Sequence, residues 1–262
     1  MTSLPAVLIT GASSGIGATY AQRFAQRGHD LVLVARNTAR LEALAAELRQ
    51  KNGVSVDIIT ADLTQPADVA QVEARLRDDE RIGILVNNAG TAIGGSFLEQ
   101  DSDDATRLVA LNATTPLRLA SAIAPRLAKA GDGAIINIAS VVGLAPESGM
   151  SVYGATKAFV LFLSQALSVE LGSKGVYVQA VLPAKTRTEI WGHAGTDVNT
   201  LSDVMEVADL VDAALVGFDR REPVTIPPLP DGGQWEAFEA ARRAMLPNFA
   251  NEHPAERYRK AA

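Results

Sequence analysis

The stretch Thr10-Gly11-Ala12-Ser13-Ser14-Gly15-Ile16-Gly17 decides the fold class of this 262-residue chain. It follows the apolar run Ala6-Val7-Leu8-Ile9 and opens an amphipathic pattern over residues 15–28. Glycines let a backbone come close to a phosphate, and a helix N-terminus offers free N–H groups to an anion. The spacing is Gly-x-x-x-Gly-x-Gly, not the commoner Gly-x-Gly-x-x-Gly. The turn therefore predicts a phosphate-binding edge after the first strand.

The rest of the chain repeats this alternation of short apolar runs and longer amphipathic ones. Near-continuous apolar runs predict buried parallel strands at 6–10, 30–35, 54–60, 82–87, 134–138, 176–181 and 223–226. Helical spacing predicts helices near 15–28, 39–51, 66–79, 102–129, 151–172 and 203–217. The predicted fold class is α/β: a single doubly wound Rossmann-type domain over 1–262, with a mostly parallel seven-stranded sheet and helices on both faces. The rhythm breaks at about 227, so residues 227–262 are expected to form a C-terminal appendage.

Composition narrows the class of protein further. The net charge is −6 and no basic run is present, which argues against a nucleic-acid partner. Zero cysteines fit a reducing compartment. No apolar run approaches the roughly 20 residues of a spanning helix, and no basic, apolar leader is present. We therefore expect a soluble, cytoplasmic protein with no membrane partner.

The end of the second predicted strand bears on the choice between NAD and NADP. In folds of this kind an acidic residue there accepts hydrogen bonds from the ribose 2′-hydroxyl and repels a 2′-phosphate. This chain has Val34-Ala35-Arg36-Asn37 instead. A guanidinium pairs well with phosphate oxygens, and Arg40 adds charge one turn into the next helix. The pattern favours NADP(H), with a solvated surface arginine as the alternative interpretation of Arg36.

Several motifs follow one another in a fixed order along the chain. They are residues 10–17, Asp62-Leu63, Asn87-Asn88-Ala89-Gly90, Asn112, Ser140, Tyr153-Gly154-Ala155-Thr156-Lys157, and Leu182-Pro183 on to Thr188. Each motif alone is a weak signal, but the set in this order is a strong one. From residue 5 to about 226 the chain resembles the short-chain dehydrogenase/reductase family, in its single-domain, NADP-preferring branch.

The resemblance implies an oxidoreductase that moves a hydride between a nicotinamide and a carbonyl or secondary alcohol. Charge that develops on the carbonyl oxygen must receive a proton, and the resemblance assigns this role to Tyr153. Lys157, one helical turn on, is expected to lower the Tyr153 pKa and to hold the nicotinamide ribose. Ser140 is expected to donate to the substrate oxygen, and Asn112 to hold a water that links Lys157 to solvent. Asn112 has a second interpretation as a polar residue that bends a helix.

The other motif positions are expected to contact the cofactor, NADP(H). The full predicted set is Gly11, Ser13, Ser14, Gly15, Ile16, Gly17, Arg36, Arg40, Asp62, Leu63, Asn88, Ala89, Gly90, Tyr153, Lys157, Pro183, Thr186 and Thr188. Asn88 is interpreted as partly structural, and Asp62 also suits the start of the helix that Pro66 opens. The family usually has Pro-Gly after the sixth strand, but this chain has Pro183-Ala184, so the backbone there is expected to run differently.

The substrate is expected to contact Ser140, Val142, Tyr153, Trp191 and His193, under a lid at about 189–203. The segments expected to line the pocket are mostly apolar or small, with no cluster of arginine or lysine. This favours a small-molecule ketone, aldehyde or secondary alcohol. Two alternatives stay open: a 3-oxoacyl-carrier or thioester reductase, and a non-catalytic NADP-binding regulatory or scaffold protein. The intact set of Ser140, Tyr153 and Lys157 argues against the second alternative.

Metal binding and assembly complete the predictions. The three histidines, His29, His193 and His253, are scattered and lack metal-ligand spacing, so no metal site is predicted. His193 is also open to interpretation as a plain loop residue. Relatives pair the helices that correspond to 102–129 and 151–172, which implies a homodimer or homotetramer.

Overall fold

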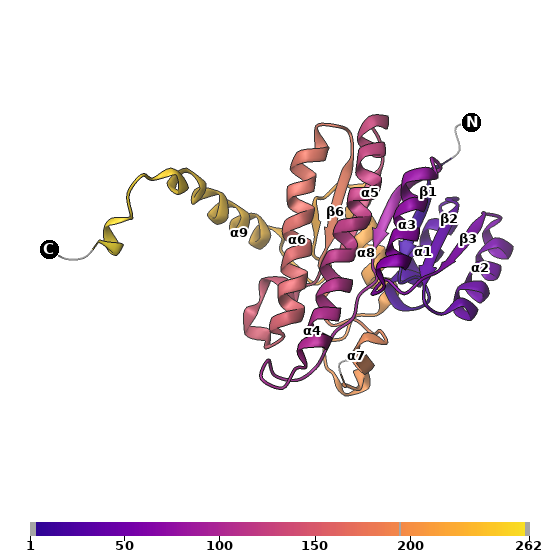
Figure 1. Cartoon of the computed structure of the whole chain (residues 1–262), viewed down its shortest axis with the longest axis horizontal. Helices are drawn as coiled ribbons and strands as arrows, with labels where there is room; N and C mark the ends of the chain where they lie inside the picture. The colour runs from indigo at the N-terminus through magenta and orange to yellow at the C-terminus, as the bar shows by residue number, and fades with distance from the viewer. Residues whose placement is uncertain (1–3, 194, 260–262) are drawn as a thin grey trace. The chain divides into compact units, whose positions relative to one another are not determined.

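The computed structural model describes residues 4–193 and 195–259, apart from the side chain of His193. The chain divides into two compact units, Met1–Pro227 and Pro228–Ala262. The first unit holds one seven-stranded sheet in the order β3-β2-β1-β4-β5-β6-β7, with every pair parallel. The strands are β1 (Ala6–Thr10), β2 (Leu31–Ala35), β3 (Val56–Thr60), β4 (Ile82–Asn87), β5 (Ala134–Ile138), β6 (Tyr177–Val181) and β7 (Val224–Thr225). Figure 1 labels β1, β2, β3 and β6 among the helices. The predicted α/β fold class is confirmed.

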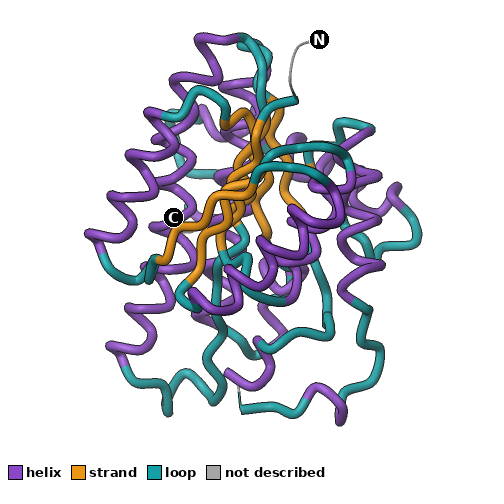
Figure 2. Tube along the Cα trace, turned by 90° about the vertical axis from the view of Figure 1, so that its right-hand side faces the viewer, coloured by secondary structure: helices purple, strands orange, loops and turns teal. Residues whose placement is uncertain are grey.

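Helices cover both faces of this sheet, as the strands and helices of Figure 2 show. They are α1 (Gly15–Gln26), α2 (Thr38–Asn52), α3 (Pro66–Asp78), α4 (Ser102–Val109), α5 (Thr115–Ala130), α6 (Ser151–Gly172), α7 (Ile190–His193) and α8 (Val207–Asp219). One core cluster contains buried side chains of α1, α2 and α8, and the other contains those of α3, α5 and α6. The sheet order reverses between β1 and β4, which places the ligand-binding edge beside the glycine-rich turn.

Alternate residues of the central strands serve the two cores. Val7 and Ile9 of β1 belong to the cluster with Phe24 of α1, whereas Leu8 belongs to the cluster with Ile123 of α5. Side chains of a strand point alternately to opposite faces, so both faces of β1 need apolar residues. This is why the strands read as unbroken apolar runs in the sequence.

The prediction of a single helix over 102–129 is wrong in one respect, because the helix is interrupted. A π-helical turn at Ala110–Thr114 separates α4 from α5. The Thr115 N–H donates to the Ala110 carbonyl oxygen, five residues back, and the Thr115 hydroxyl lies 3.1 Å from the same oxygen and 2.9 Å from that of Leu63. The contact with Leu63, in the loop after β3, helps to stabilise the wider turn. Such turns often occur at functional sites.

Helix α6 is notable for its length and apolar character. It has 22 residues with only two charged side chains, Lys157 and Glu170. Although the sequence has no unbroken apolar run of that length, α6 is long and apolar enough to cross a bilayer by length and composition, the one such helix in the described part of the chain. It packs against β6, but Phe162 and Val169 on its outer side are 71% and 81% exposed. The helix therefore presents an apolar stripe as well as a buried one.

The second unit is built around one helix, α9 (Gly232–Ala244). Asp231 caps this helix by accepting a hydrogen bond from Gly233 N at 2.9 Å. Trp235 and Phe238 stack along it, with ring centroids 5.4 Å apart. Two short 3₁₀ turns follow, at Leu246–Ala250 and Glu256–Tyr258. The unit carries no strand among its described residues.

Candidate active site

The glycine-rich turn runs from the end of β1 to the start of α1 and has a backbone that suits glycine. Gly11 and Gly15 have φ angles of 65° and 52°, in the left-handed region where most side chains are strained. At Gly17 the constraint is space, because a Cβ atom there would lie 2.3 Å from the carbonyl oxygen of Gly11. The three glycines therefore hold the turn tight against the first turn of α1.

The residues that follow β4 fix this turn in place. Asn88 Nδ2 donates to the carbonyl oxygens of Thr10 and Gly11, at 2.9 and 3.3 Å. The Thr10 hydroxyl accepts hydrogen bonds from the backbone N–H groups of Asn88 and Ala89, at 2.9 and 3.0 Å. The carboxyl ends of two neighbouring strands are thereby joined. Asn88 thus has a structural role, whatever contact it makes with a ligand.

A cavity of about 520 Å³ lies between the glycine-rich turn and the segment that follows β6. Its lining residues are Ser14, Gly15, Arg187, Thr188, Glu189, Trp191, Gly192, Thr196, Asp197 and Val198. The Ser14 side chain makes no capping hydrogen bond to α1, so the first N–H groups of that helix keep their capacity to bind an anion. The left-handed glycines, the uncapped helix start and the cavity together fit the diphosphate of a dinucleotide.

Two arginines lie beside the carboxyl end of β2. Arg36 directly follows the strand and is exposed. Arg40 lies in the first turn of α2, and its N–H donates to the capping side chain of Asn37 at 3.0 Å. Its guanidinium Nη1 donates to both carboxylate oxygens of Glu189, at 3.0 and 2.8 Å. The sequence analysis placed Glu189 at the start of the lid but did not predict this pair, because Glu189 belongs to no motif and lies 149 residues from Arg40.

The segment after β3 is ordered by Asp62. The Asp62 carboxylate accepts from the N–H and the hydroxyl of Thr64, at 3.0 and 2.8 Å. The residue does not cap α3, because the N-cap position is Gln65 and the helix begins at Pro66. Leu63 is buried, with a relative exposure of 5%. The contact of Asp62 and Leu63 with an adenine stays a prediction.

Ser140 ends the extension of β5 and is buried. Its hydroxyl donates to the carbonyl oxygen of Pro183 at 3.2 Å and accepts from the N–H of Val142 at 3.2 Å. Pro183 follows β6, the neighbour of β5 in the sheet. Ser140 is therefore held by two strand ends, and its hydroxyl is close enough to that of Tyr153 to affect the Tyr153 pKa.

Tyr153 and Lys157 lie one turn apart on α6. Lys157 is 5% exposed, and its Nζ lies 5.6 Å from the centroid of the Tyr153 ring. The same Nζ donates to the carbonyl oxygen of Ile138, the last residue of β5, at 2.9 Å. Ser140, Tyr153 and Lys157 are therefore brought together by the end of β5 and the start of α6.

The pKa of Tyr153 does not follow the expectation that Lys157 lowers it. Burial raises the pKa of Tyr153 to about 12, and the nearby Ser140 hydroxyl opposes that rise. Burial also lowers the pKa of Lys157 to about 8. The net shift of the Tyr153 pKa is opposite to the expected one, because loss of solvation disfavours both charged forms. Lowering of the Tyr153 pKa by the Lys157 charge stays a prediction. In this state Tyr153 is a protonated hydroxyl.

Asn112 lies within the π-helical turn and is 1% exposed. Its Oδ1 accepts from Thr91 N at 3.0 Å, and its Nδ2 lies 2.8 Å from Thr91 O and 3.3 Å from the Thr156 hydroxyl. The side chain therefore ties the loop after β4 to α6. A Cβ atom on Gly90 would lie 3.2 Å from Asn112 Oδ1 and 3.6 Å from Lys157 Nζ. Gly90 thus lies between the two side chains that the sequence links in a proton relay.

The two ends of the segment that follows β6 are paired with each other. Thr186 forms an isolated parallel bridge with Met205, and Arg187 N donates to Met205 O at 3.0 Å. The Thr186 carbonyl oxygen accepts from Trp191 Nε1 at 2.8 Å. A Cβ atom on Gly15 would lie 3.2 Å from the Thr188 methyl group, so this segment meets the glycine-rich turn. Ala184 is not among the described residues with positive φ, so the chain needs no glycine there.

The predicted substrate contacts differ in how far the structure describes them. Val142 is half-buried in a short 3₁₀ turn after Ser140. Trp191, also half-buried, lines the cavity from α7. The side chain of His193, which ends α7, lies outside the described part of the chain. Among described residues, no group of three or more His, Asp or Glu side chains is placed to hold a metal ion.

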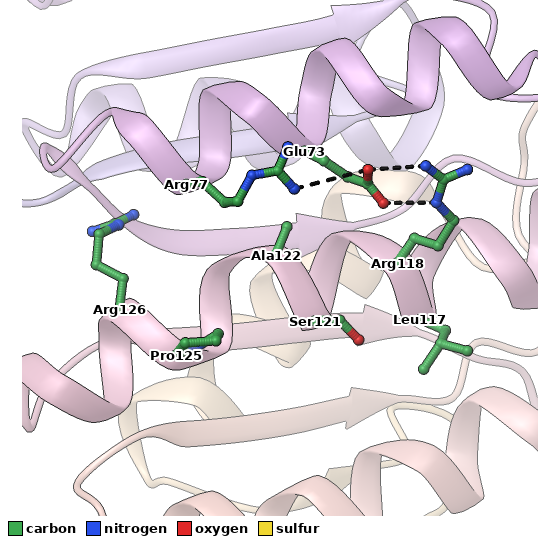
Figure 3. A pocket seen from close by; sticks show the side chains of 8 residues that line it. All are labelled: Glu73, Arg77, Leu117, Arg118, Ser121, Ala122, Pro125 and Arg126. Atoms are coloured by element: carbon green, nitrogen blue, oxygen red, sulfur yellow. Dashed lines mark hydrogen bonds and ion pairs between the residues drawn. The ribbon is translucent and has the colours of Figure 1, made fainter.

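A second cavity, of about 540 Å³, lies between α3 and α5 and has a different character (Figure 3). Its arginines are engaged in the protein's own contacts. Arg118 makes two hydrogen bonds to Glu73, at 2.6 and 2.9 Å, and Arg126 donates to carbonyl oxygens near the end of α3. None of the predicted catalytic residues lines it. We therefore assign the candidate active site to the edge with the glycine-rich turn.

Comparison with known proteins places the chain in a family. A family model for short chain dehydrogenases matches residues 5–199. A solved short-chain dehydrogenase from Sphingobium yanoikuyae, in complex with NADPH, is 65% identical; the match covers 98% of this chain and 100% of that one, with a TM-score of 0.96. The bulky-bulky ketone specific alcohol dehydrogenase from Comamonas testosteroni is 57% identical over 98% of this chain and 99% of that one, with a TM-score of 0.92.

A more distant similarity links the chain to a longer protein. It is 36% identical to the very-long-chain 3-oxoacyl-CoA reductase of Bos taurus over 187 residues, which is 70% of this chain. The match spans only 60% of the length of that reductase. The chain belongs to the short-chain dehydrogenase family and is an oxidoreductase.

Proposed function

We propose that this protein is an NADP(H)-dependent oxidoreductase that interconverts a small-molecule ketone or aldehyde and the corresponding alcohol. The observation that carries the proposal is the convergence of Ser140, Tyr153 and Lys157 at the sheet edge that also carries the glycine-rich turn. The similarity to an NADPH-bound short-chain dehydrogenase at 65% identity supports the cofactor. The exposed Arg36 after β2, with no carboxylate beside it, supports the preference for the 2′-phosphate.

In the proposed mechanism, bound NADPH supplies the hydride and this chain's residues handle the proton. Tyr153 is protonated at neutral pH because its pKa is raised to about 12, so it is in the form that donates a proton to the substrate oxygen. Lys157, with a pKa of about 8, is largely an ammonium at pH 7, and its charge stabilises the phenolate that forms on donation. Ser140, whose hydroxyl donates to Pro183 O in this structure, turns that proton to the same substrate oxygen when the substrate binds.

Replacement of the proton on Tyr153 requires a path to solvent. We assign this path to Lys157 and the π-helical turn that contains Asn112. The Asn112 side chain is already engaged by Thr91, so its amide positions the turn and the loop after β4. The widened backbone of this turn offers carbonyl groups that a bound water needs. In this proposal Asn112 acts on the relay through its backbone.

The substrate class is the finer part of the proposal. The relative at 57% identity is named for bulky-bulky ketones, and two of the predicted substrate contacts, Val142 and Trp191, are half-buried apolar side chains. We infer that the preferred substrate is a ketone with two sizeable apolar substituents. The second candidate is a 3-oxoacyl thioester, which is supported by the match to a 3-oxoacyl-CoA reductase.

A substrate panel tests both candidates. NADPH oxidation is followed at the reduced-nicotinamide absorbance band with aryl alkyl ketones, ketones with two large substituents, simple aldehydes and 3-oxoacyl thioesters. We expect the highest kcat/KM with the ketones that carry two large substituents. Faster turnover of 3-oxoacyl thioesters would select the second candidate, and no turnover with any carbonyl compound would favour the non-catalytic alternative.

Assembly into a homodimer or homotetramer is also part of the proposal, together with a location in the cytoplasm. Phe159, Phe162 and Val169 lie three, seven and ten residues apart on one side of α6 and are 41%, 71% and 81% exposed. A stripe of exposed apolar side chains of this kind marks an interaction surface. The same helix from a second copy covers it in a two-fold contact.

Light scattering on Phe162→Glu tests this surface. Wild-type protein at micromolar concentration is expected to have twice or four times the mass of the chain, and the glutamate should shift it towards the monomer because a charge cannot be buried unpaired in the contact. Leu98→Glu, at a side chain that is 94% exposed but lies off α6, is the matched control and should keep the wild-type mass. A monomeric wild-type protein would contradict the assembly.

A further inference from the structure

The lid, residues 189–203, is closed at its base by pairing of the segments on either side. Arg187 N donates to Met205 O at 3.0 Å, and Met205 N donates to Lys185 O at 2.9 Å. The Arg187 guanidinium adds contacts with Glu206 at 2.8 Å and Asn199 at 3.2 Å. These contacts hold the two ends of the lid together, and none of them joins the lid to α2.

The contact between Glu189 and Arg40 joins the lid to a different part of the sheet edge. Arg40 belongs to α2, the helix that follows Arg36 and the carboxyl end of β2. Both oxygens of the Glu189 carboxylate accept from the same nitrogen, Arg40 Nη1. The Nε and Nη2 atoms of Arg40 donate to no residue that the structure describes. With Nη1 engaged by Glu189, the edge formed by Nε and Nη2 still presents two parallel N–H groups to two oxygens of an anion.

We propose that Glu189 is a specificity-determining residue for NADP(H), which acts by holding Arg40 so that its Nε and Nη2 face the 2′-phosphate. This inference rests on the proposed function. A free arginine side chain on the surface samples many rotamers, and fixing it in one costs conformational entropy when a ligand binds. The contact with Glu189 fixes the Arg40 side chain in one rotamer before the cofactor binds. A single guanidinium then joins the lid and the phosphate.

For Glu189→Gln, the inference predicts a change in NADPH affinity opposite to the one that charge repulsion alone predicts. A carboxylate near a phosphate repels it, so removal of the charge alone would strengthen NADPH binding. If Glu189 instead orients Arg40, Glu189→Gln weakens NADPH binding and leaves NADH binding unchanged, because NADH has no 2′-phosphate. Both side chains are about half exposed, so we expect a loss of up to about fivefold, the scale of an exposed ion pair.

The experiment measures dissociation constants for NADPH and NADH by calorimetry with wild type, Glu189→Gln, Arg40→Met and the double variant. The two single variants should each weaken NADPH binding, and the double variant should be no weaker than Arg40→Met, because the two residues act as a unit. Asp219→Asn is the matched control: Asp219 is 56% exposed, against 57% for Glu189, and pairs with Arg27, which lies 192 residues away at the C-terminal end of α1, opposite the glycine-rich turn. It should leave both dissociation constants unchanged.

A fluorescence measurement without cofactor tests whether the contact between Arg40 and Glu189 restrains the lid. The chain has two tryptophans, Trp191 and Trp235, so Trp235→Phe leaves Trp191 of the lid as the single reporter. In that background, Glu189→Gln and Arg40→Met should each raise acrylamide quenching of Trp191, whereas Arg118→Met, on α5, should not.

The outcomes separate this inference from the proposed function. Unchanged or stronger NADPH binding by Glu189→Gln, in a protein that still reduces ketones, would overturn the inference alone. Unchanged quenching of Trp191 would also overturn it. If the wild-type protein bound neither cofactor, the proposed function would fail, and the inference would fail with it.

Discussion

The buried centre and the exposed rim of the candidate site are held by different kinds of contact. In the buried centre (Asn112, Ser140, Tyr153 and Lys157), hydrogen bonds to backbone groups fix the side chains of Asn112, Ser140 and Lys157. The half-buried Tyr153 lies one turn from Lys157 on α6. In the exposed rim (Arg36, Arg40 and the lid, residues 189–203), one ion pair between half-exposed side chains, Arg40 and Glu189, joins the lid to α2. The same sheet edge therefore carries one part that is fixed and one that is adjustable.

The physical consequences of a substitution differ between these two parts. Removal of one partner of a buried hydrogen bond leaves the other unsatisfied, which costs about 1–3 kcal/mol. An exposed ion pair is screened by water and contributes roughly 0–1 kcal/mol. Chemistry that needs a fixed geometry suits the buried centre, and the choice of cofactor and substrate suits the rim. The predictions below test this division.

The largest effect is expected from Tyr153→Phe, which removes the group that donates the proton. The ring stays, so packing on α6 is kept, and cofactor affinity should barely change. Turnover should fall by roughly 10²–10⁴-fold, the usual scale for a lost general acid. Single-turnover reduction of the best ketone of the panel, at saturating NADPH, measures the effect.

Tyr177→Phe is the control for this substitution. Tyr177 begins β6, and its hydroxyl donates to the carbonyl oxygen of Glu222 at 2.7 Å, so its loss affects stability but no proton donor. It should keep turnover near the wild-type value. Near-wild-type turnover by Tyr153→Phe would show that another group is the acid.

Substitution of Arg36 in the exposed rim should change selectivity without affecting chemistry. Wild-type protein is expected to bind NADPH about ten- to hundred-fold more tightly than NADH, the scale of a charge-assisted contact. Arg36→Asp should erase or reverse that ratio, because a carboxylate repels the phosphate and accepts hydrogen bonds from a ribose. Dissociation constants for both cofactors give the ratio.

The rate of the chemical step with saturating cofactor should stay close to that of wild type in Arg36→Asp. Arg220→Asp is a charge-matched control, since its side chain is 71% exposed and follows α8. Equal affinities of the wild-type protein for the two cofactors would contradict the role of Arg36.

What could be predicted from the sequence depends on how far apart in the chain the contacting residues lie. The strands of the sheet were predictable because residues such as Val7 and Leu8 are buried on opposite faces, which leaves an apolar run that a local pattern can detect. The glycine-rich turn was predictable because glycine alone satisfies its φ angles without strain. Both features depend on residues close together in the chain.

Features that depend on distant residues were missed. The π-helical turn around Asn112 is supported by a contact between Thr115 and Leu63, 52 residues apart. The pair of Arg40 and Glu189 is 149 residues apart. The raised pKa of Tyr153 follows from burial, which no spacing of Tyr and Lys on a helix reveals. Motifs thus identified the chemical groups, and only the fold determines their protonation.

The pKa of Lys157 leads to the last prediction, which concerns stability. Its folded-state value of about 8 lies below the ordinary 10.5 because the ammonium is buried. Between these values the unfolded chain binds more protons than the folded one, so the free energy of unfolding rises with pH in that window and falls as pH drops towards 8. A pKa unit corresponds to about 1.4 kcal/mol, so wild type should gain about 2 kcal/mol from pH 7 to 9.5 relative to Lys157→Met.

Urea unfolding of the cofactor-free protein at pH 7, 8, 9 and 9.5 measures this difference. The range stops below pH 10, because the raised pKa of Tyr153 means that the unfolded chain loses that proton first above pH 10, so stability then falls with rising pH. Lys51→Met is the control, since Lys51 is 67% exposed and its loss reports only the general effect of one charge. A constant difference between wild type and Lys157→Met across the range would mean that the lysine is solvated in the folded protein. The buried centre would then be as accessible to water as the rim, and the division between them would fail.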